Sequence, residues 1–112
     1  MNVTRISEAK PYDAKGHFGM TALRLQGLEA TPIQAFSVGL SHFLPGGGAE
    51  MSGSNVERVY FVLSGEIVVV TEAGEVTLTA MDSCGIPAGE RRAVVNRGNL
   101  PASLLVVVAR KS

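Results

Sequence analysis

Residues 45–65 read PGGGAEMSGSNVERVYFVLSG, and this stretch decides the fold. Three consecutive glycines at 46–48 lead through small polar residues into an alternating apolar run. Glycines cluster where a backbone approaches another group closely or turns where a side chain would clash, and here we expect a mobile loop at a pocket entrance. Because strand residues alternate, Arg58, Tyr60 and Val62 share one face of the strand that follows. That face is typical of the polar end of a mostly apolar pocket.

Runs typical of short strands lie on both sides of this stretch. Residues 36–44 alternate until a proline stops them, and residues 67–71 are nearly all β-branched and turn at 72–75 into a further strand. The other predicted strands cover residues 18–26, 56–63, 76–79, 81–86, 91–96 and 103–109. Short strands separated by Gly and Pro, without sustained helical spacing, indicate an all-β antiparallel sandwich or barrel. Residues 1–17 are predicted to form a loosely held N-terminal arm with a short extended piece at 3–6.

Composition limits the class of protein. A chain of 112 residues with 46% hydrophobic residues is expected to form one domain around a single core. Ten basic residues balance ten acidic ones, so no global charge recruits nucleic acid or an anionic membrane. The lone Cys84 has no disulfide partner, residues 1–13 lack the apolar run of a signal peptide, and the longest apolar run, 104–109, is too short to span a bilayer. We therefore expect one soluble, cytoplasmic domain over residues 1–112.

A second informative stretch, residues 81–96, reads MDSCGIPAGERRAVVN. Asp82, Pro87, Gly89 and Asn96 stand in the order and spacing of the second motif of the cupin superfamily. Pro87 to Gly89 forms a tight turn between two predicted strands in this motif.

The first cupin motif is matched by Pro45-Gly46, the hydrophobic strand and Gly65. Over residues 36–108 the chain therefore resembles a small single-domain cupin. The resemblance implies a small antiparallel jelly-roll barrel with an internal pocket, often in a homodimer.

The chain departs from this resemblance at the metal site. A metal-binding cupin carries two histidines one residue apart and then a glutamate in the first motif, and a further histidine in the second. In the present chain, the resemblance puts Ser52 and Ser54 at the positions of the paired histidines. If the loop is one residue longer, Met51 and Gly53 stand there instead. Arg58 takes the position of the glutamate and Arg92 that of the last histidine. A guanidinium has no lone pair for a metal, and a hydroxyl is a poor replacement for imidazole. We therefore expect no metal in this place and no other cofactor.

Two arginines replace the metal ligands, and the resemblance implies that Arg58 and Arg92 both point into the barrel. Two guanidiniums in an apolar pocket repel each other unless an anion lies between them. This anion is either a bound carboxylate or phosphate, or a protein carboxylate, for which Glu50 and Glu90 are candidates. If the turn is irregular, Arg91 faces inward in place of its neighbour.

Two further side chains are candidates for acid–base catalysis. His42 shares a face of strand 36–44 with Val38 and Leu40, and we expect this face to line the barrel interior. There, close to Tyr60, His42 serves as a general base or acid, or else it is a half-buried histidine bonded to a backbone carbonyl. Tyr60 either donates a hydrogen bond to a ligand or packs in the core with its hydroxyl satisfied. The predicted ligand-binding residues are Arg58, Arg92, Ser52, Ser54 and Glu50.

Three functional hypotheses remain open at this point. The first is a metal-independent protein that binds a small anionic metabolite, with or without acid–base catalysis. The second is a metal-dependent enzyme, of the dioxygenase or isomerase type, with an atypical ligand set that includes His42 and Glu50. The third is a structural or regulatory module whose barrel is packed shut.

A homodimer is expected under each of these hypotheses. Val59, Phe61 and Leu63 share one face of their strand, so that this face or its opposite leaves apolar side chains on the outside of the barrel. The N-terminal arm can also cover a neighbour's sheet edge.

Overall fold

The computed structural model describes residues 1–110, which form nine β-strands and one 3₁₀ turn, η1 (Ile6–Glu8). The strands are β1 (Lys10–Tyr12), β2 (His17–Gln26), β3 (Phe36–Ser52), β4 (Arg58–Ser64), β5 (Ile67–Thr71), β6 (Gly74–Leu78), β7 (Ser83–Ile86), β8 (Arg92–Val95) and β9 (Ala102–Ala109). All pairings are antiparallel, which confirms the all-β prediction. None of the helical segments among these residues is long and apolar enough to cross a membrane.

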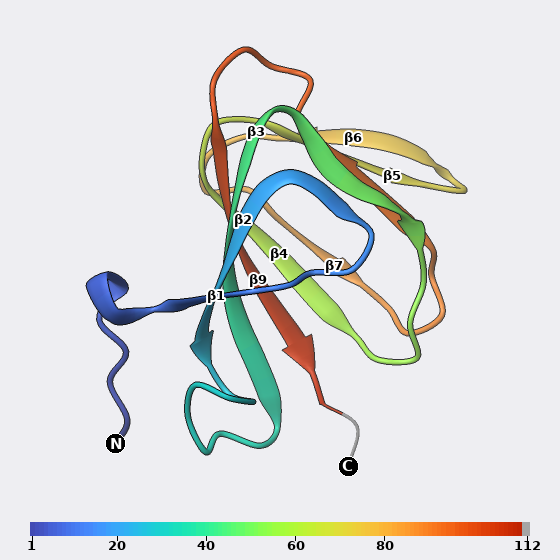
Figure 1. The fold of residues 1–112 in the computed structure, drawn as a ribbon. Coiled ribbons are helices and arrows are strands. Elements are labelled where there is room, and N and C mark those ends of the chain that lie inside the picture. The colour runs from blue at the N-terminus through green and yellow to red at the C-terminus, as the bar shows by residue number, and fades with distance from the viewer. Residues whose placement is uncertain (111–112) are drawn as a thin grey trace.

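The long strand β3 joins the two layers of a jelly-roll barrel (Figure 1). Its first half pairs with β9 and its second half pairs with β8, while β2 runs along its other edge. The hydrogen-bonded order β6-β5-β8-β3-β9-β4-β7 therefore wraps into a barrel whose two ends, β6 and β7, do not pair with each other. The barrel is therefore not closed by hydrogen bonds between β6 and β7.

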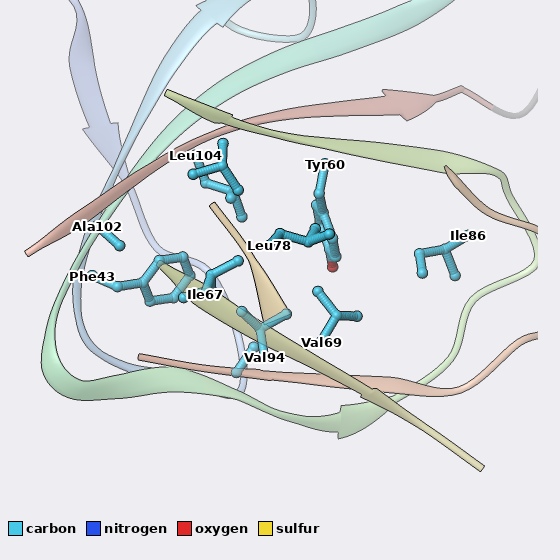
Figure 2. Packing of buried hydrophobic residues seen from close by; sticks show 11 residues of the cluster. Phe43, Tyr60, Ile67, Val69, Leu78, Ile86, Val94, Ala102 and Leu104 are labelled. Carbon is cyan, nitrogen blue, oxygen red and sulfur yellow. The ribbon is translucent and has the colours of Figure 1, made fainter. Parts of the chain in front are cut away.

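The core fills the space between the two layers (Figure 2). Its members come from strands of both layers, and the largest ones are Phe43, Tyr60, Val62, Ile67, Val69, Leu78, Ile86, Val94 and Leu104. Apolar burial of this kind contributes about 25 cal/mol for each Å² removed from water and is the main force holding the layers together. Figure 2 shows the Tyr60 ring extending from β4 into this interior.

The glycines at 46–48 are part of β3, so the prediction of a mobile entrance loop is wrong. A Cβ on Gly47 would lie 2.1 Å from the carbonyl oxygen of Gly19, and one on Gly48 would lie 2.1 Å from the carbonyl oxygen of Val94. Gly46 has a φ of +84°, a conformation that favours glycine. The glycines therefore let β3 bend and approach the backbones of β2 and β8 closely. Close backbone approach was one of the two reasons given for a cluster of glycines.

The inward face of β3 is the opposite of the predicted one. Phe43 belongs to the core and is 2% exposed, so alternation places Ser41 and Gly39 inside and His42 outside. The inner residues are small because Tyr12 fills this space: a Cβ on Gly39 would lie 2.7 Å from the Tyr12 hydroxyl oxygen. The pattern of large apolar residues on 36–44 therefore identified the outer face.

The N-terminal arm is more ordered than predicted. Residues 3–6 do not form a strand, but β1 pairs with β2 of the same chain. The Arg24 guanidinium stacks on the Tyr12 ring at 3.6 Å and is paired with Glu29 at 3.0 Å. The arm thus covers an edge of its own sheet.

Two residues of the second motif, Asp82 and Asn96, have structural roles. The Asp82 carboxylate accepts hydrogen bonds from the backbone and the hydroxyl of Thr79, at 2.9 and 3.1 Å. The buried Asn96 amide donates to the carbonyl oxygens of Phe43 and Leu100, at 3.1 and 2.9 Å. The predicted hairpin is also present, as β5 and β6 joined at Glu72–Ala73.

Candidate functional site

Arg92 is buried at the start of β8 and donates three hydrogen bonds to two residues. It is the first residue of β8 and pairs in register with Ser52 of β3 and Thr71 of β5. Its Nε donates to the Tyr60 hydroxyl oxygen at 2.7 Å, and its Nη1 donates to the Ser52 carbonyl and hydroxyl oxygens at 3.0 and 2.6 Å. Only 4% of the residue is exposed. The structure therefore brings together three of the predicted site residues.

The charge of Arg92 has no protein counterion among the described residues. The ion pairs within residues 1–110 join Arg24 to Glu29 and Arg97 to Glu75. In the same part of the chain the Nη2 group of Arg92 makes no hydrogen bond. No buried side-chain nitrogen or oxygen among these residues lacks a hydrogen-bond partner, so Nη2 reaches solvent and is open to a ligand atom, while the rest of the guanidinium is held without a carboxylate.

An open cleft of about 300 Å³ lies near this guanidinium, although neither Arg92 nor Tyr60 is among its lining residues. Its wall includes Thr71, the cross-strand neighbour of Arg92, and Cys84, the cross-strand neighbour of Tyr60. Directly opposite residues in an antiparallel pair have side chains about 5 Å apart, so the Arg92–Tyr60 pair lies behind this part of the cleft wall. The remaining lining residues are Val69, Ala73, Gly74, Glu75, Val76, Gly85, Ile86 and Glu90. We call this space the mouth cleft.

Arg58 is half-buried and lines a different cleft, of about 380 Å³, with Glu57 and Pro87. Its Nη2 donates to the Ser54 hydroxyl at 3.0 Å. Ile86 lines both clefts and lies between them. Arg92 and Arg58 therefore bond to nearby serines, one at the end of β3 and one in the loop after it, but Arg58 lines this cleft and Arg92 lines neither.

The turn before β8 determines which arginine faces inward. Gly89 has a φ of +88°, and its backbone N–H donates to the Ser54 carbonyl oxygen at 2.7 Å. Arg91 is exposed and packs over Gly53, where a Cβ would lie 3.2 Å from the Arg91 Cγ. Of the two candidates, Arg92 is the buried one.

His42 and Glu50 do not join this site. Because His42 faces outward, its Nδ1 bonds to the Ser103 hydroxyl at 2.7 Å instead of approaching Tyr60. Glu50 is exposed beside the β1–β2 loop, and its backbone N–H donates to the Gly16 carbonyl oxygen at 2.8 Å. The expectation that His42 lies in the barrel interior near Tyr60 is wrong, since small residues and Phe43 occupy that face.

The other histidine, His17, is also absent from the lining of the mouth cleft. His17 begins β2, is half-buried and stacks on the Phe43 ring with 6.4 Å between ring centroids. Its Nδ1 donates to the Lys15 carbonyl oxygen at 2.8 Å. It packs against the core rather than lying free in a loop.

Cys84 faces the mouth cleft as a free thiol. Burial raises the pKa of this thiol, and the negative charge of Glu90 raises it further, against a lowering contribution from the Tyr60 backbone. The thiol is therefore protonated at neutral pH, and a protonated thiol is a poor nucleophile. Its chemistry does not suit a catalytic cysteine.

The residues that the resemblance assigns to the metal site of a cupin do not suit a divalent ion. Two hydroxyls (Ser52 and Ser54) and two guanidiniums (Arg58 and Arg92) stand there, and guanidiniums cannot ligate a cation. Among residues 1–110, His, Cys, Asp and Glu side chains form no group of three or more that could hold a metal. The arrangement instead suits an anion or a hydroxyl-bearing ligand.

A jelly-roll barrel with a polar site at its mouth defines the class of this protein. Residues 39–108 match the Cupin domain family, so the chain belongs to the cupin family. The chain is also 44% identical over 109 residues to Beta-D-galactosidase Rv1717 of Mycobacterium tuberculosis, covering 97% of this chain and 94% of the relative.

Solved structures agree on the fold. The polyketide cyclase RemF from Streptomyces resistomycificus superposes with a TM-score of 0.87 at 18% identity, covering 99% of this chain and 80% of that one. A predicted oxalate decarboxylase from Thermotoga maritima has a TM-score of 0.83 at 26% identity and covers 99% of this chain and 100% of that one.

Sequence reasoning did not include Thr71, Cys84 and Glu90 in the site. The hairpin signal at 72–75 predicted the turn, but not that it would face the turn before β8 across the mouth cleft. Glu90 was considered only as a partner for an arginine. The sequence feature that could have indicated Glu90 is its position in a predicted turn, directly before Arg91 and Arg92.

Proposed function

We propose that this chain is a metal-independent cupin that binds a small anionic or hydroxyl-rich molecule in the mouth cleft. The observation that carries the proposal is the buried Arg92 guanidinium, which has no carboxylate within 4.0 Å among the described residues. A ligand oxygen at its Nη2 would supply the missing acceptor, and a carboxylate or phosphate would also neutralise the charge.

Tyr60 and Ser52 orient Arg92 in this proposal. Because the Tyr60 oxygen accepts from Arg92 Nε, the hydroxyl hydrogen of Tyr60 remains available for a ligand. Ser52 fixes Nη1 through two acceptors. Arg58 and Ser54 lie at the neighbouring opening and would contact only a ligand that extends past Ile86.

Binding is tested by thermal-shift and calorimetric titration with a panel of carboxylates, phosphates and galactosides. Arg92→Met should weaken binding of any hit by about tenfold or more, as expected for a lost hydrogen bond to a charged group. The matched control is Arg91→Gln, which removes the neighbouring exposed arginine and should bind like the wild type. Equal affinity of Arg92→Met and the wild type for every hit would refute the proposal.

Hydrolysis of a β-galactoside is a second candidate function for the same cleft. It is favoured by the 44% identity to the protein named a β-D-galactosidase, which extends over nearly the whole of both chains. Glycoside hydrolysis needs groups that give and take a proton on either side of the scissile bond. The carboxylates of Glu75 and Glu90, which line the mouth cleft, offer such groups. Release of nitrophenol from an aryl β-galactoside is the direct test.

Metal independence is tested separately, by elemental analysis of the purified protein before and after dialysis against a chelator. We expect activity and ligand binding to survive chelation. One tightly held metal per chain would contradict the proposal and direct attention to His42 and Glu50. We also propose a cytoplasmic location, on the sequence alone, which cell fractionation tests.

A further inference from the structure

A separate pocket, of about 230 Å³, lies between the N-terminal arm, β2 and the turn after β2. At about 30 Å³ for each water molecule, this space suits a small molecule rather than a drug-sized one. It shares no lining residue with the mouth cleft or with the cleft at Arg58, and Figure 1 shows η1 far from the β5–β6 hairpin. We call it the arm pocket, and its lining residues are Val3, Thr4, Glu8, Ala9, Lys10, Arg24, Glu29 and Ala30.

Two cationic side chains lie opposite each other at the arm pocket. Lys10 of β1 pairs in register with Arg24 of β2, and both residues line the pocket. Like charges directly opposite each other in an antiparallel pair are destabilising. Glu29 pairs with Arg24 at 3.0 Å, but the ion pairs among residues 1–110 do not include Lys10. An anion bound between the two cations would therefore offset their repulsion.

The guanidinium of Arg24 is held in one orientation. Its central carbon lies 3.6 Å from the centroid of the Tyr12 ring, and its Nε donates to Glu29 Oε1 at 3.0 Å. Its two Nη groups make no hydrogen bond within residues 1–110, where no buried side-chain nitrogen or oxygen lacks a partner. Although only 14% of the side chain is exposed, both Nη groups therefore reach solvent. A guanidinium fixed in this way presents two parallel donors to a carboxylate.

The arm pocket also contains a carboxylate that has no cationic partner in the described part of the chain. Glu8, the last residue of η1, lines the pocket. The ion pairs within residues 1–110 do not include Glu8, although Lys10 follows two residues later. The lining therefore offers two cations to a carboxylate and one free carboxylate to an ammonium group.

We propose that the arm pocket binds a small zwitterion of the α-amino acid class. Arg24 and Lys10 bind its carboxylate, and Glu8 binds its ammonium group. The valine and the two alanines of the lining leave room for a short apolar side chain. The site goes beyond the function proposed above, because none of its residues belongs to the mouth cleft.

The test is an NMR titration of the isotope-labelled protein with L-alanine, acetate or methylammonium. L-alanine should produce saturable shifts in the backbone amides of the arm pocket, and the two half-molecules should bind more weakly. Arg24→Gln and Lys10→Met should each weaken L-alanine binding by about tenfold, as expected for a lost hydrogen bond to a charged group. Arg5→Met is the matched control, since Arg5 is an exposed arginine of the same arm outside the lining and its replacement should leave binding unchanged.

Glu8→Gln separates the two halves of the proposed ligand. It should weaken binding of L-alanine and leave binding of acetate as in the wild type, because acetate has no ammonium group. Acetate that binds as tightly as L-alanine to the wild type, or L-alanine that binds equally to Glu8→Gln and the wild type, would overturn the assignment to a zwitterion.

The absence of saturable shifts at the arm pocket with all three probes would overturn the site itself. Arg24→Gln also removes the contacts to Tyr12 and Glu29, so amide exchange of residues 10–12 is measured to show whether β1 still pairs with β2. If that pairing is lost, Lys10→Met decides: unchanged affinity for L-alanine would refute the proposal, and a tenfold loss would support it.

Discussion

Arg92 combines deep burial with an unneutralised charge, and this combination separates a functional residue from a structural one. A buried ion that exists for stability is expected to have its counterion within the protein. Here the guanidinium is held by two hydroxyls and a carbonyl, which orient it but do not neutralise it. The fold therefore carries a desolvation cost that a bound anion would offset.

Replacing Arg92 by methionine should leave stability unchanged or raise it by about 1 kcal/mol, since buried ions replaced by apolar residues of similar volume are often neutral or stabilising. The same variant should lose ligand binding. Denaturant unfolding of the wild type and Arg92→Met without ligand provides the measurement. Tyr60→Phe serves as a control that removes one acceptor and retains the charge.

A loss of more than about 2 kcal/mol in Arg92→Met would contradict this expectation. It would mean that the hydrogen bonds of Arg92 to Ser52 and Tyr60 hold the mouth together. Arg92 would then be a structural residue.

The Cys84 thiol provides a pH-dependent probe of Glu90. Its pKa is raised by burial and by the Glu90 charge, so alkylation should be slow at neutral pH and accelerate as the pH rises through the raised pKa. Glu90→Gln removes the charge contribution and lowers the pKa, so its alkylation should accelerate at lower pH than in the wild type. Iodoacetamide modification followed by mass spectrometry gives both profiles. Identical profiles would mean that Glu90 does not face Cys84.

Residue-level prediction from sequence succeeded where a motif fixed the position. The second motif predicted an inward-facing Arg92, and the structure buries this side chain against Tyr60 and Ser52. Prediction failed for His42, because the alternation of a strand gives two faces without saying which one is inner. Tyr12, thirty residues away in the chain, decided that choice.

At the scale of elements, β3 connects the two layers, and its glycines make the connection possible. Sequence predicted two pieces, a strand ending at Pro45 and a loop after it, because Pro and Gly usually end strands. The structure has one strand through this region, since close backbone approach from β2 and β8 replaces the missing side-chain contacts. Such an approach depends on distant strands and leaves no local signal beyond the glycines.

Gly48→Ala should destabilise the fold by about 2–4 kcal/mol, because its Cβ would lie 2.1 Å from the Val94 carbonyl oxygen and β8 would have to move. Gly85→Ala is the matched control in β7, where a Cβ would meet no atom within 4 Å. Thermal unfolding of both variants measures the difference. Equal melting temperatures for the two variants would show that the β3–β8 contact relaxes at no cost.

At the scale of the whole molecule, the fold class and the two-motif core were predictable, because Gly and Pro punctuation and strand alternation are local signals. The site was predictable only in part. Its cleft forms where the β5–β6 turn meets the turn before β8, and this meeting depends on the order of strands in the barrel. No local pattern encodes that order.

The outer face of the β4–β9–β3 layer is the surface on which we propose that two copies of this chain associate. Two rows of apolar residues cross these three strands in register. The rows are Val59–Val107–Val38 and Phe61–Leu105–Leu40, and because Leu40 is only 7% exposed the second row is accessible only over β4 and β9. Val59 is 43% exposed and Leu63, on the same face of β4, is 37% exposed. Continuous apolar rows on a sheet exterior are typical of protein–protein contacts.

Light scattering on the purified wild type should therefore give the mass of a homodimer. Val59→Lys should shift the protein to monomer, because a lysine in the middle of an apolar contact would be desolvated without a partner. Val76→Lys is the control: Val76 is also exposed, but on β6 at the other end of the strand order, and its substitution should leave the dimer intact. A monomeric wild type at every concentration tested would refute the association, and a dimer broken equally by both substitutions would place the contact elsewhere. If Val59→Lys is a folded monomer that still binds ligand, the mouth cleft is complete within one chain, as its lining by residues of one chain leads us to expect.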